Sequence, residues 1–190
     1  MKIPQAWQDA RGTDEFVEGG DHRGGDFSNA DLSDIRLERL QAATASFRAA
    51  IFEEFRCVDS DFSGASFVGA NLEDANLFDC RLPDADFSGC LMSRVKLATS
   101  ALQRSNFEAA TLCDSDLAGA DFEGANLRDA ELNRATANCT SFRKADLTGA
   151  DFSGANLEDA SFLGAILTDV NFTGAKLDGA EFDPGKQPTC

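Results

Sequence analysis

The stretch ADLTGADFSGANLEDASFLGA, residues 145–165, repeats itself every five residues. A small residue recurs at Ala145 and Ala150, and a large apolar residue follows each of them by two positions, at Leu147 and Phe152. Side chains on an α-helix recur with a period of 3.6 residues and those on a flat strand with a period of two, so neither explains this pattern. The stretch therefore predicts a coil whose backbone bends once in every five residues.

The period continues in both directions from this stretch. Steps of five from Phe27 to Phe182 give 32 central positions without insertion or deletion, 13 of them Phe and 15 Leu. The small position, two residues before the central one, holds Ala, Ser, Cys, Gly or Thr at 27 of these 32 places. The turn position, two residues after it, is mostly Gly, Asp or Asn, which tolerate a positive φ. The leading and trailing positions lie directly before and after the central one.

The segments ADLTG, ADFSG, ANLED and ADFEG resemble the A(D/N)LxX motif of the pentapeptide-repeat proteins. The resemblance covers residues 25–184 and implies an all-β fold, the right-handed quadrilateral parallel β-helix, with four pentapeptides in each coil. About eight coils are expected, or ~38 Å of length at ~4.8 Å per coil. Residues 1–24 are expected to form an N-terminal cap with a degenerate first repeat and Trp7 as an apolar lid. Residues 185–190 are expected to form a disordered tail, beside a last coil that is open or covered by a second molecule.

Side chains twenty residues apart should then lie above one another on the same face of the coil. Two internal ladders of phenylalanine are predicted, Phe27 to Phe107 on one face and Phe122 to Phe182 on another. Close packing also predicts a compensation of volume, because a large residue occupies the small position at Leu40 and Phe55 where the following central residues are small. Cys57, Cys80 and Cys90 are predicted to point inward as reduced, structural cysteines.

Charge is predicted to differ between the four faces, which begin at Phe27, Leu32, Leu37 and Ala42. The second face carries nine acids against only Arg94 and Arg134, and is called the acidic face below. We expect it to bind a protein partner, or alternatively to serve only the solubility of the β stack. Its acids are Asp31, Asp34, Glu53, Glu54, Glu73, Asp74, Asp114, Glu131 and Asp151.

The third face has an apolar column at the trailing position of four successive coils. Its members are Val58, Phe78, Ala98 and Ala118, and Phe78 is the only phenylalanine of the repeat that should point outward. A contiguous exposed apolar column favours contact with another molecule, such as a second copy in a homodimer. The alternative is a neutral surface without a partner.

Composition excludes several classes of function. A net charge of -16 argues against direct binding of nucleic acid or an anionic membrane. The first residues, MKIPQAWQDARG, contain no apolar run of signal-peptide length, so we expect a cytoplasmic protein. With a single histidine and no CxxC pair, no metal site and no cofactor are expected. Carboxylate pairs such as Glu53 and Glu54 should lie on a convex wall without a pocket, so no catalytic residue is assigned.

The chain is similar in these respects to the quinolone-resistance (Qnr) and mycobacterial fluoroquinolone-resistance proteins of the same family. That resemblance implies a non-enzymatic mimic of duplex DNA, which binds gyrase or topoisomerase IV and protects it from drugs or toxins, as in antibiotic resistance or self-immunity. The alternative is a structural module for protein–protein interaction without a topoisomerase role. The two hypotheses differ in whether the acidic face has a partner.

Overall fold

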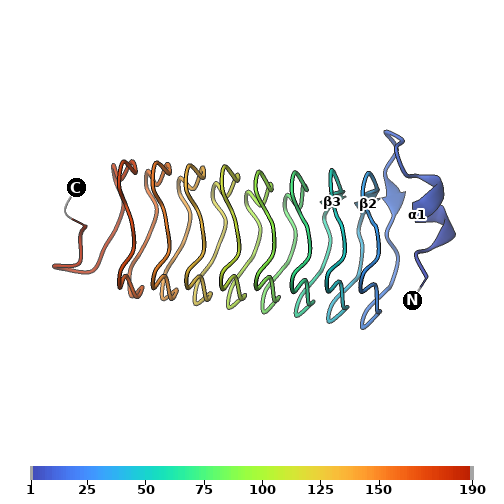
Figure 1. Cartoon of the computed structure of the whole chain (residues 1–190), viewed down its shortest axis with the longest axis horizontal. Coiled ribbons are helices and arrows are strands. Elements are labelled where there is room, and N and C mark those ends of the chain that lie inside the picture. The colour runs from blue at the N-terminus through green and yellow to red at the C-terminus, as the bar shows by residue number, and fades with distance from the viewer. Residues whose placement is uncertain (1, 189–190) are drawn as a thin grey trace.

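The computed structural model describes residues 2–188, which form a rod of stacked coils (Figure 1). A short helix, α1 (Gln5–Asp9), lies at the N-terminal end. Three short strands follow, β1 (Val17–Glu18), β2 (Arg36–Glu38) and β3 (Arg56–Val58), and pair in parallel in the order β1-β2-β3. The remaining coils are joined by isolated parallel bridges between residues twenty apart, such as Asp31 to Ile51.

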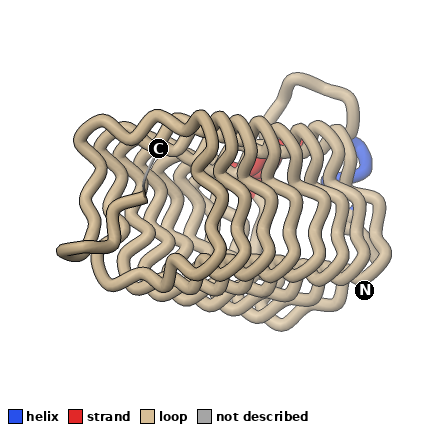
Figure 2. The backbone as a smooth tube through the Cα atoms, turned by 60° about the vertical axis from the view of Figure 1, so that its left-hand side comes forward, coloured by secondary structure: helices blue, strands red, loops and turns tan. Residues whose placement is uncertain are grey.

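Backbone hydrogen bonds hold each coil to the coils before and after it. The Ser46 N–H donates to the carbonyl of Gly25 in the preceding coil at 2.8 Å. The Phe47 N–H donates to the carbonyl of Ser66 in the following coil at 2.7 Å. The same two bonds recur around the rod, so that its faces are parallel ladders of stacked coils, seen obliquely in Figure 2. The predicted right-handed quadrilateral β-helix is confirmed.

A four-residue turn forms each corner of the coil. At one such corner the Ala50 N–H donates to the carbonyl of Phe47 at 3.0 Å, and Ala49 at the turn position has φ +53°. A positive φ costs an L-residue about 1–2 kcal/mol, which explains why glycine and aspartate recur there. The five-residue period therefore reflects one turn and one short extended segment per pentapeptide.

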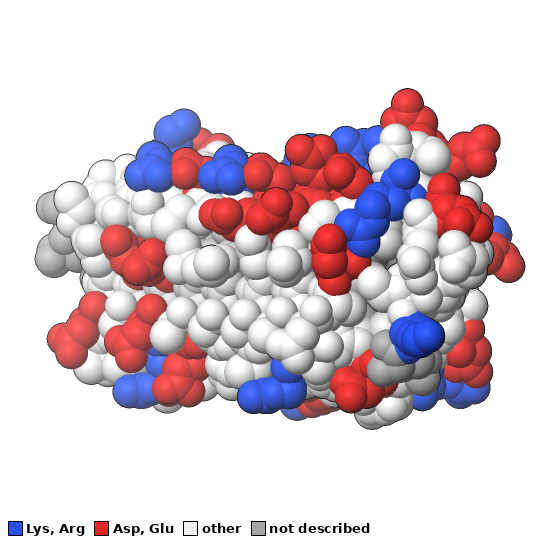
Figure 3. Space-filling model, turned by 45° about the vertical axis from the view of Figure 1, so that its right-hand side comes forward, with Lys and Arg blue, Asp and Glu red and all other residues white. Residues whose placement is uncertain are grey.

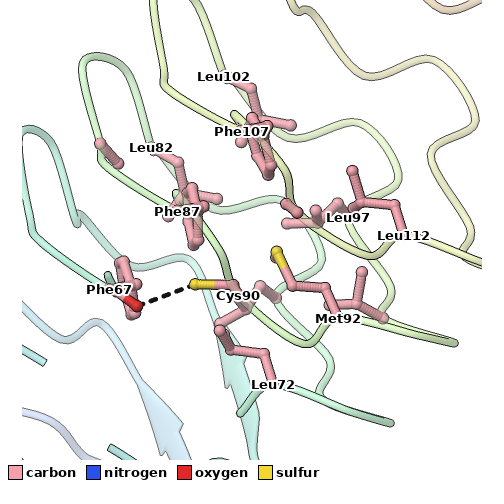
Figure 4. Close-up of a cluster of buried hydrophobic side chains, with 14 of the residues drawn as sticks. Phe67, Leu72, Leu82, Phe87, Cys90, Met92, Leu97, Leu102, Phe107 and Leu112 are labelled. Atoms are coloured by element: carbon pink, nitrogen blue, oxygen red, sulfur yellow. Dashed lines mark hydrogen bonds between the residues drawn. The ribbon is translucent and has the colours of Figure 1, made fainter. Parts of the chain in front are cut away.

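The interior is filled by the central and small positions, as predicted. Stacked rings connect Phe67 to Phe87 and Phe87 to Phe107, with centroids 4.6 and 4.7 Å apart (Figure 4). The second predicted ladder forms as well, from Phe122 through to Phe182. Stacked rings of this kind add attraction beyond the burial of their apolar area.

The predicted compensation of volume is also found. Leu40 and Ala42 are both fully buried, and so are Phe55 and Cys57. Large and small residues can exchange places because both positions point into the same interior.

The cysteines at interior positions are fully buried in the described chain. Burial raises the pKa of the Cys90 thiol to about 12, and its Sγ donates to the carbonyl of Phe67 at 2.9 Å (Figure 4). The pKa of Cys80 is also raised, chiefly by its hydrogen bond with the Cys57 side chain. Thiols in this state react poorly, which fits the structural role expected of them.

The two ends of the rod differ. Trp7 on α1 is buried and stacks on Phe27 with centroids 5.6 Å apart, at the N-terminal end of the interior. Val17, within the segment 1–24 expected to hold a degenerate first repeat, pairs with Leu37, and Phe16 is left exposed.

The last coil has no equivalent lid among the described residues. Its apolar side chains, Leu167, Val170, Phe172, Leu177 and Phe182, are only partly buried. A hollow of ≈ 480 Å³ opens beside Phe172, and Lys186 and Pro188 of the following segment line it. Of the tail expected at residues 185–190, only 185–188 are described, and residues 189 and 190 lie outside the described part.

Candidate protein-binding faces

The structure brings the nine acids of the acidic face together. The leading positions of this face form one continuous ladder, Asp31 to Ile51 to Asn71 and onward to Glu131, Asp151 and Asn171. The trailing and turn positions run alongside this ladder because every pentapeptide adopts the same conformation. The acids reach this face through the five-residue turn period alone, with no loop or insertion.

Some of these acids are required by the fold. The carboxylate of Asp31 accepts the backbone N–H of Ser33 at 3.0 Å, and that of Asp151 accepts the N–H of Ser153 at 2.8 Å. This bond lowers the pKa of Asp31 below its ordinary value, and Arg11 lowers it further. Leading Asp and Asn residues make the same bond on other faces, for example Asp61 and Asn76. The D/N of the motif therefore accepts a backbone N–H of the turn that follows it, and its acidity is partly structural.

Other acids of the face are neutralised by arginine in the neighbouring coil. Arg94 donates two hydrogen bonds to Asp74, both at 2.7 Å, and Arg134 donates two to Asp114 at 2.8 and 2.7 Å. These hydrogen bonds lower the pKa of Asp74 and Asp114. Arg11 forms a third ion pair, with Asp31. Both basic residues of this face, Arg94 and Arg134, are thus ion-paired with acids of the same face.

Six carboxylates of this face have no ion pair within residues 2–188, and four of them lie on three successive coils at the N-terminal end. We call these four the acidic cluster: Asp34, Glu53, Glu54 and Glu73. The Glu53 carboxylate accepts a hydrogen bond from the neutral side chain of Asn71 at 3.0 Å. Glu54 adopts φ +55° at a turn position, where glycine or aspartate would cost less. Figure 3 shows this distribution, with acidic side chains gathered toward the N-terminal end of the visible face and alternating charges along its edge.

The remaining predicted acids of the face, Glu131 and Asp151, lie further along the rod. Cys113 lies along the rod between the acidic cluster and Glu131, and its Sγ is 2.8 Å from Oδ1 of Asn133 in the next coil. The face is therefore not uniformly acidic, because its unpaired charge concentrates toward the N-terminal coils. Exposed Ile51 and Leu91 interrupt its leading column.

The four residues of the apolar column lie one above another on the third face. Arg56, Asn76, Lys96 and Asp116 pair in sequence along the leading ladder, which places the four trailing residues one above another. Phe78 is 46% exposed and Val58 and Ala118 are partly exposed, whereas Ala98 is 9% exposed. Strands β2 and β3 belong to this face (Figure 2).

The two larger hollows of the described chain both border the last coil, many coils away from the acidic cluster. Among residues 2–188, no three His, Cys, Asp or Glu side chains converge on a point that could hold a metal ion. The same residues include no helix with the length and apolarity needed to cross a membrane.

The family follows from this geometry together with the sequence. A family model described as pentapeptide repeats matches in several copies that together span residues 56–183. The chain belongs to the pentapeptide-repeat family. No curated protein sequence matches the chain.

Solved structures of pentapeptide-repeat proteins are similar in fold. Full-length QnrB1, a plasmid-mediated fluoroquinolone resistance protein, is 19% identical over 90% of each chain, with a TM-score of 0.56. HetL, which is involved in heterocyst differentiation regulation in the cyanobacterium Nostoc sp. strain PCC 7120, is 22% identical over 90% of each chain, with a TM-score of 0.42.

A pentapeptide-repeat protein of the Arabidopsis thaliana thylakoid lumen is 28% identical over 50% of the present chain, with a TM-score of 0.45. The match spans 65% of the Arabidopsis protein's length. At these identities the likenesses bear on the fold alone.

Sequence reasoning missed the division of the acids into structural, paired and unpaired ones. A signal for it was present, because Asp74 and Arg94, Asp84 and Arg104, and Asp114 and Arg134 all stand twenty residues apart at turn positions. The structure turns each of these coincidences into a two-bond ion pair.

Proposed function

We propose that this protein is a non-enzymatic mimic of duplex DNA that binds a type II topoisomerase, gyrase or topoisomerase IV, in the cytoplasm. In doing so it would protect the enzyme from inhibitors and confer antibiotic resistance or self-immunity. The observation that carries the proposal is the acidic cluster, whose four carboxylates have no ion pair in the described chain and no part in the turn hydrogen bonds of the fold.

The dimensions and charge of the rod support the mimicry. Eight coils at ~4.8 Å give ~38 Å, a length of B-DNA that carries about 22 phosphates at one charge per ~1.7 Å. The chain has a net charge of -16, which is within a factor of two of that value. Exposed carboxylates spaced by one coil present negative charge to a basic DNA-binding groove much as a phosphate backbone does.

QnrB1 supports the proposal through its overall shape. It is a fluoroquinolone resistance protein with the same fold over 90% of each chain. An interaction module without a topoisomerase role is the competing function, and in that case the acidic cluster would contribute only to solubility. The two functions differ in one measurable property, which is whether the cluster is needed for an effect on the enzyme.

The experiment is a DNA supercoiling assay with purified gyrase, in the presence and absence of a fluoroquinolone. Wild-type protein is expected to restore supercoiling to the drug-poisoned enzyme or to inhibit supercoiling alone. A variant with Asp34, Glu53, Glu54 and Glu73 changed to Lys should lose this effect at least about tenfold, since it reverses the attraction to a basic groove.

A matched control changes the net charge equally at a distance from the acidic cluster. Asp79, Glu158, Asp159 and Asp178 lie on the third face and have no ion pair within the described residues. Their change to Lys should leave most of the effect in place. Wild-type protein with no effect on either activity, or equal losses in the two variants, would refute the DNA-mimicry proposal and leave the interaction module.

A further inference from the structure

The third face carries a stepped apolar surface. On the coils of Val58 and Phe78 the trailing side chains are large, and on the next two coils they are the methyl groups of Ala98 and Ala118. Phe78 is 46% exposed, whereas Ala98, the trailing residue of the next coil, is 9% exposed. Two coils with large trailing side chains are thus followed, along the same ladder, by two coils with small ones.

The charged side chains beside this column form no ion pair within residues 2–188. Arg56 and Lys96 occupy its leading ladder together with Asn76 and Asp116. None of these three charged residues forms an ion pair within residues 2–188, although Asp116 accepts the Ala118 N–H at 3.2 Å. On the acidic and fourth faces, by contrast, arginines are paired with aspartates one coil away. Arg56 thus lies on the coil of the large Val58, whereas Lys96 and Asp116 lie on the coils of the small Ala98 and Ala118.

We propose that this face pairs with the same face of a second copy, in an antiparallel two-fold dimer whose axis passes between the coils of Phe78 and Ala98. A two-fold axis perpendicular to the rod places each column opposite the same column of the second copy, in reverse order. Phe78 then covers Ala98 of the second copy, and Val58 covers its Ala118. Arg56 lies opposite Asp116 of the second copy, and Lys96 lies opposite Asn76.

The antiparallel arrangement is favoured over a parallel one by packing. In a parallel pair Phe78 would meet Phe78 of the second copy and hold the alanine levels apart, which leaves a gap that close packing disfavours. In the antiparallel pair each large side chain meets a methyl group, and no like charges face each other over these four coils. The two arrangements also pair Arg56 differently, with Asp116 in one and with Asp59 in the other.

The size of the contact sets its strength. With the axis between the third and fourth of eight coils, six coils overlap over ~29 Å, and an outward strip of three residue steps is ~10 Å wide, which gives about 290 Å² for each copy. A stable dimer usually buries about 800 Å² for each partner. The dimer should therefore be reversible and should form in the range of tens to hundreds of micromolar, roughly.

Sedimentation equilibrium between about 10 µM and about 1 mM tests the proposal. The wild-type mass should rise toward twice that of one chain. Phe78→Glu and Arg56→Asp should each weaken association at least about tenfold, as expected when a central aromatic or a facing charge is lost. Leu91→Glu is the matched control, because Leu91 is 51% exposed on the acidic face, and it should associate like the wild type.

Charge exchange identifies the geometry. Arg56→Asp combined with Asp116→Arg should regain association if the copies are antiparallel, whereas Arg56→Asp combined with Asp59→Arg should regain it if they are parallel. Both residue types already occur at leading and turn positions, and circular dichroism confirms that each variant folds. A wild type that remains a single chain at all concentrations, a Phe78→Glu variant that associates normally, or recovery only in the second double variant would overturn the proposed dimer. These outcomes leave the topoisomerase proposal untouched, because it rests on a different face.

Discussion

The ring of Phe67 stacks on the ring of Phe87 in the next coil, with centroids 4.6 Å apart and planes 7° from parallel. Both side chains are completely buried. Because parallel ladders set residues twenty apart at one level per coil, identical side chains meet face to face along the interior. Contacts of this kind recur between successive coils and stabilise the rod.

Phe87→Ala is predicted to lower the free energy of unfolding by about 3–5 kcal/mol, because it leaves a cavity between two rings that cannot collapse. Phe172→Ala is the matched control, since Phe172 stacks on Phe152 but is only partly buried in the last coil. Its loss should be clearly smaller. Denaturant unfolding followed by circular dichroism measures both, and equal losses would contradict a uniformly packed interior with an open end.

Exchange of volume within one pentapeptide gives a second prediction. Phe55→Ala should cost about 3–5 kcal/mol through the cavity it creates, and Cys57→Leu should cost about 1–3 kcal/mol through overpacking. The double variant restores the small and large order of the other repeats, so its loss should fall short of the sum by about 1–3 kcal/mol. A double-mutant cycle by denaturant unfolding provides the measurement. Strict additivity would mean that the two side chains do not share one space.

The turn position predicts that glycine can stabilise the rod. Ala109 has φ +55°, which costs an L-residue more than glycine loses in unfolded-state entropy, so Ala109→Gly should stabilise the protein by roughly 0.5–1 kcal/mol. Ala43 at a trailing position has no positive φ, and Ala43→Gly should destabilise the protein by about 0.5–1 kcal/mol. Thermal unfolding of the two variants should therefore shift in opposite directions. Shifts of the same sign would show that corner geometry does not govern these positions.

The ion pair between Asp114 and Arg134 predicts a dependence on pH. The arginine hydrogen bonds lower the pKa of Asp114 in the folded protein, so the pair stabilises the fold above the unfolded pKa of about 3.9. This contribution is lost as the pH falls through the lowered folded pKa. The difference in unfolding midpoint between wild type and Asp114→Asn should thus be present near neutral pH and vanish in acid.

Arg134→Gln is the second variant in this experiment. It removes the other member of the pair, so its difference from the wild type should vanish over the same pH range. A difference that grew as the pH fell would contradict a stabilising pair.

Most of the fold could be read from the chain because its local rule is repeated. Turn residues at one position and large apolar residues two places earlier specify both the corner and the interior, and the exceptions at Leu40 and Phe55 obey the same rule of volume. The N-terminal boundary was less predictable. His22 and Val17 do not look like the motif, yet Val17 pairs with Leu37 because backbone hydrogen bonds propagate the ladder regardless of side chain.

The amino-acid sequence by itself determined the period, the register, the inward and outward positions and the face on which each acid lies, since these follow from local backbone preferences repeated without interruption. Only the tertiary structure decided which acids carry free charge. Whether Asp74 meets Arg94 or Glu53 stays without a cation depends on contacts between neighbouring coils. Those contacts depend on which side chains of adjacent coils can reach one another across the ladder. They are therefore set by neighbours in space and not by neighbours along the chain.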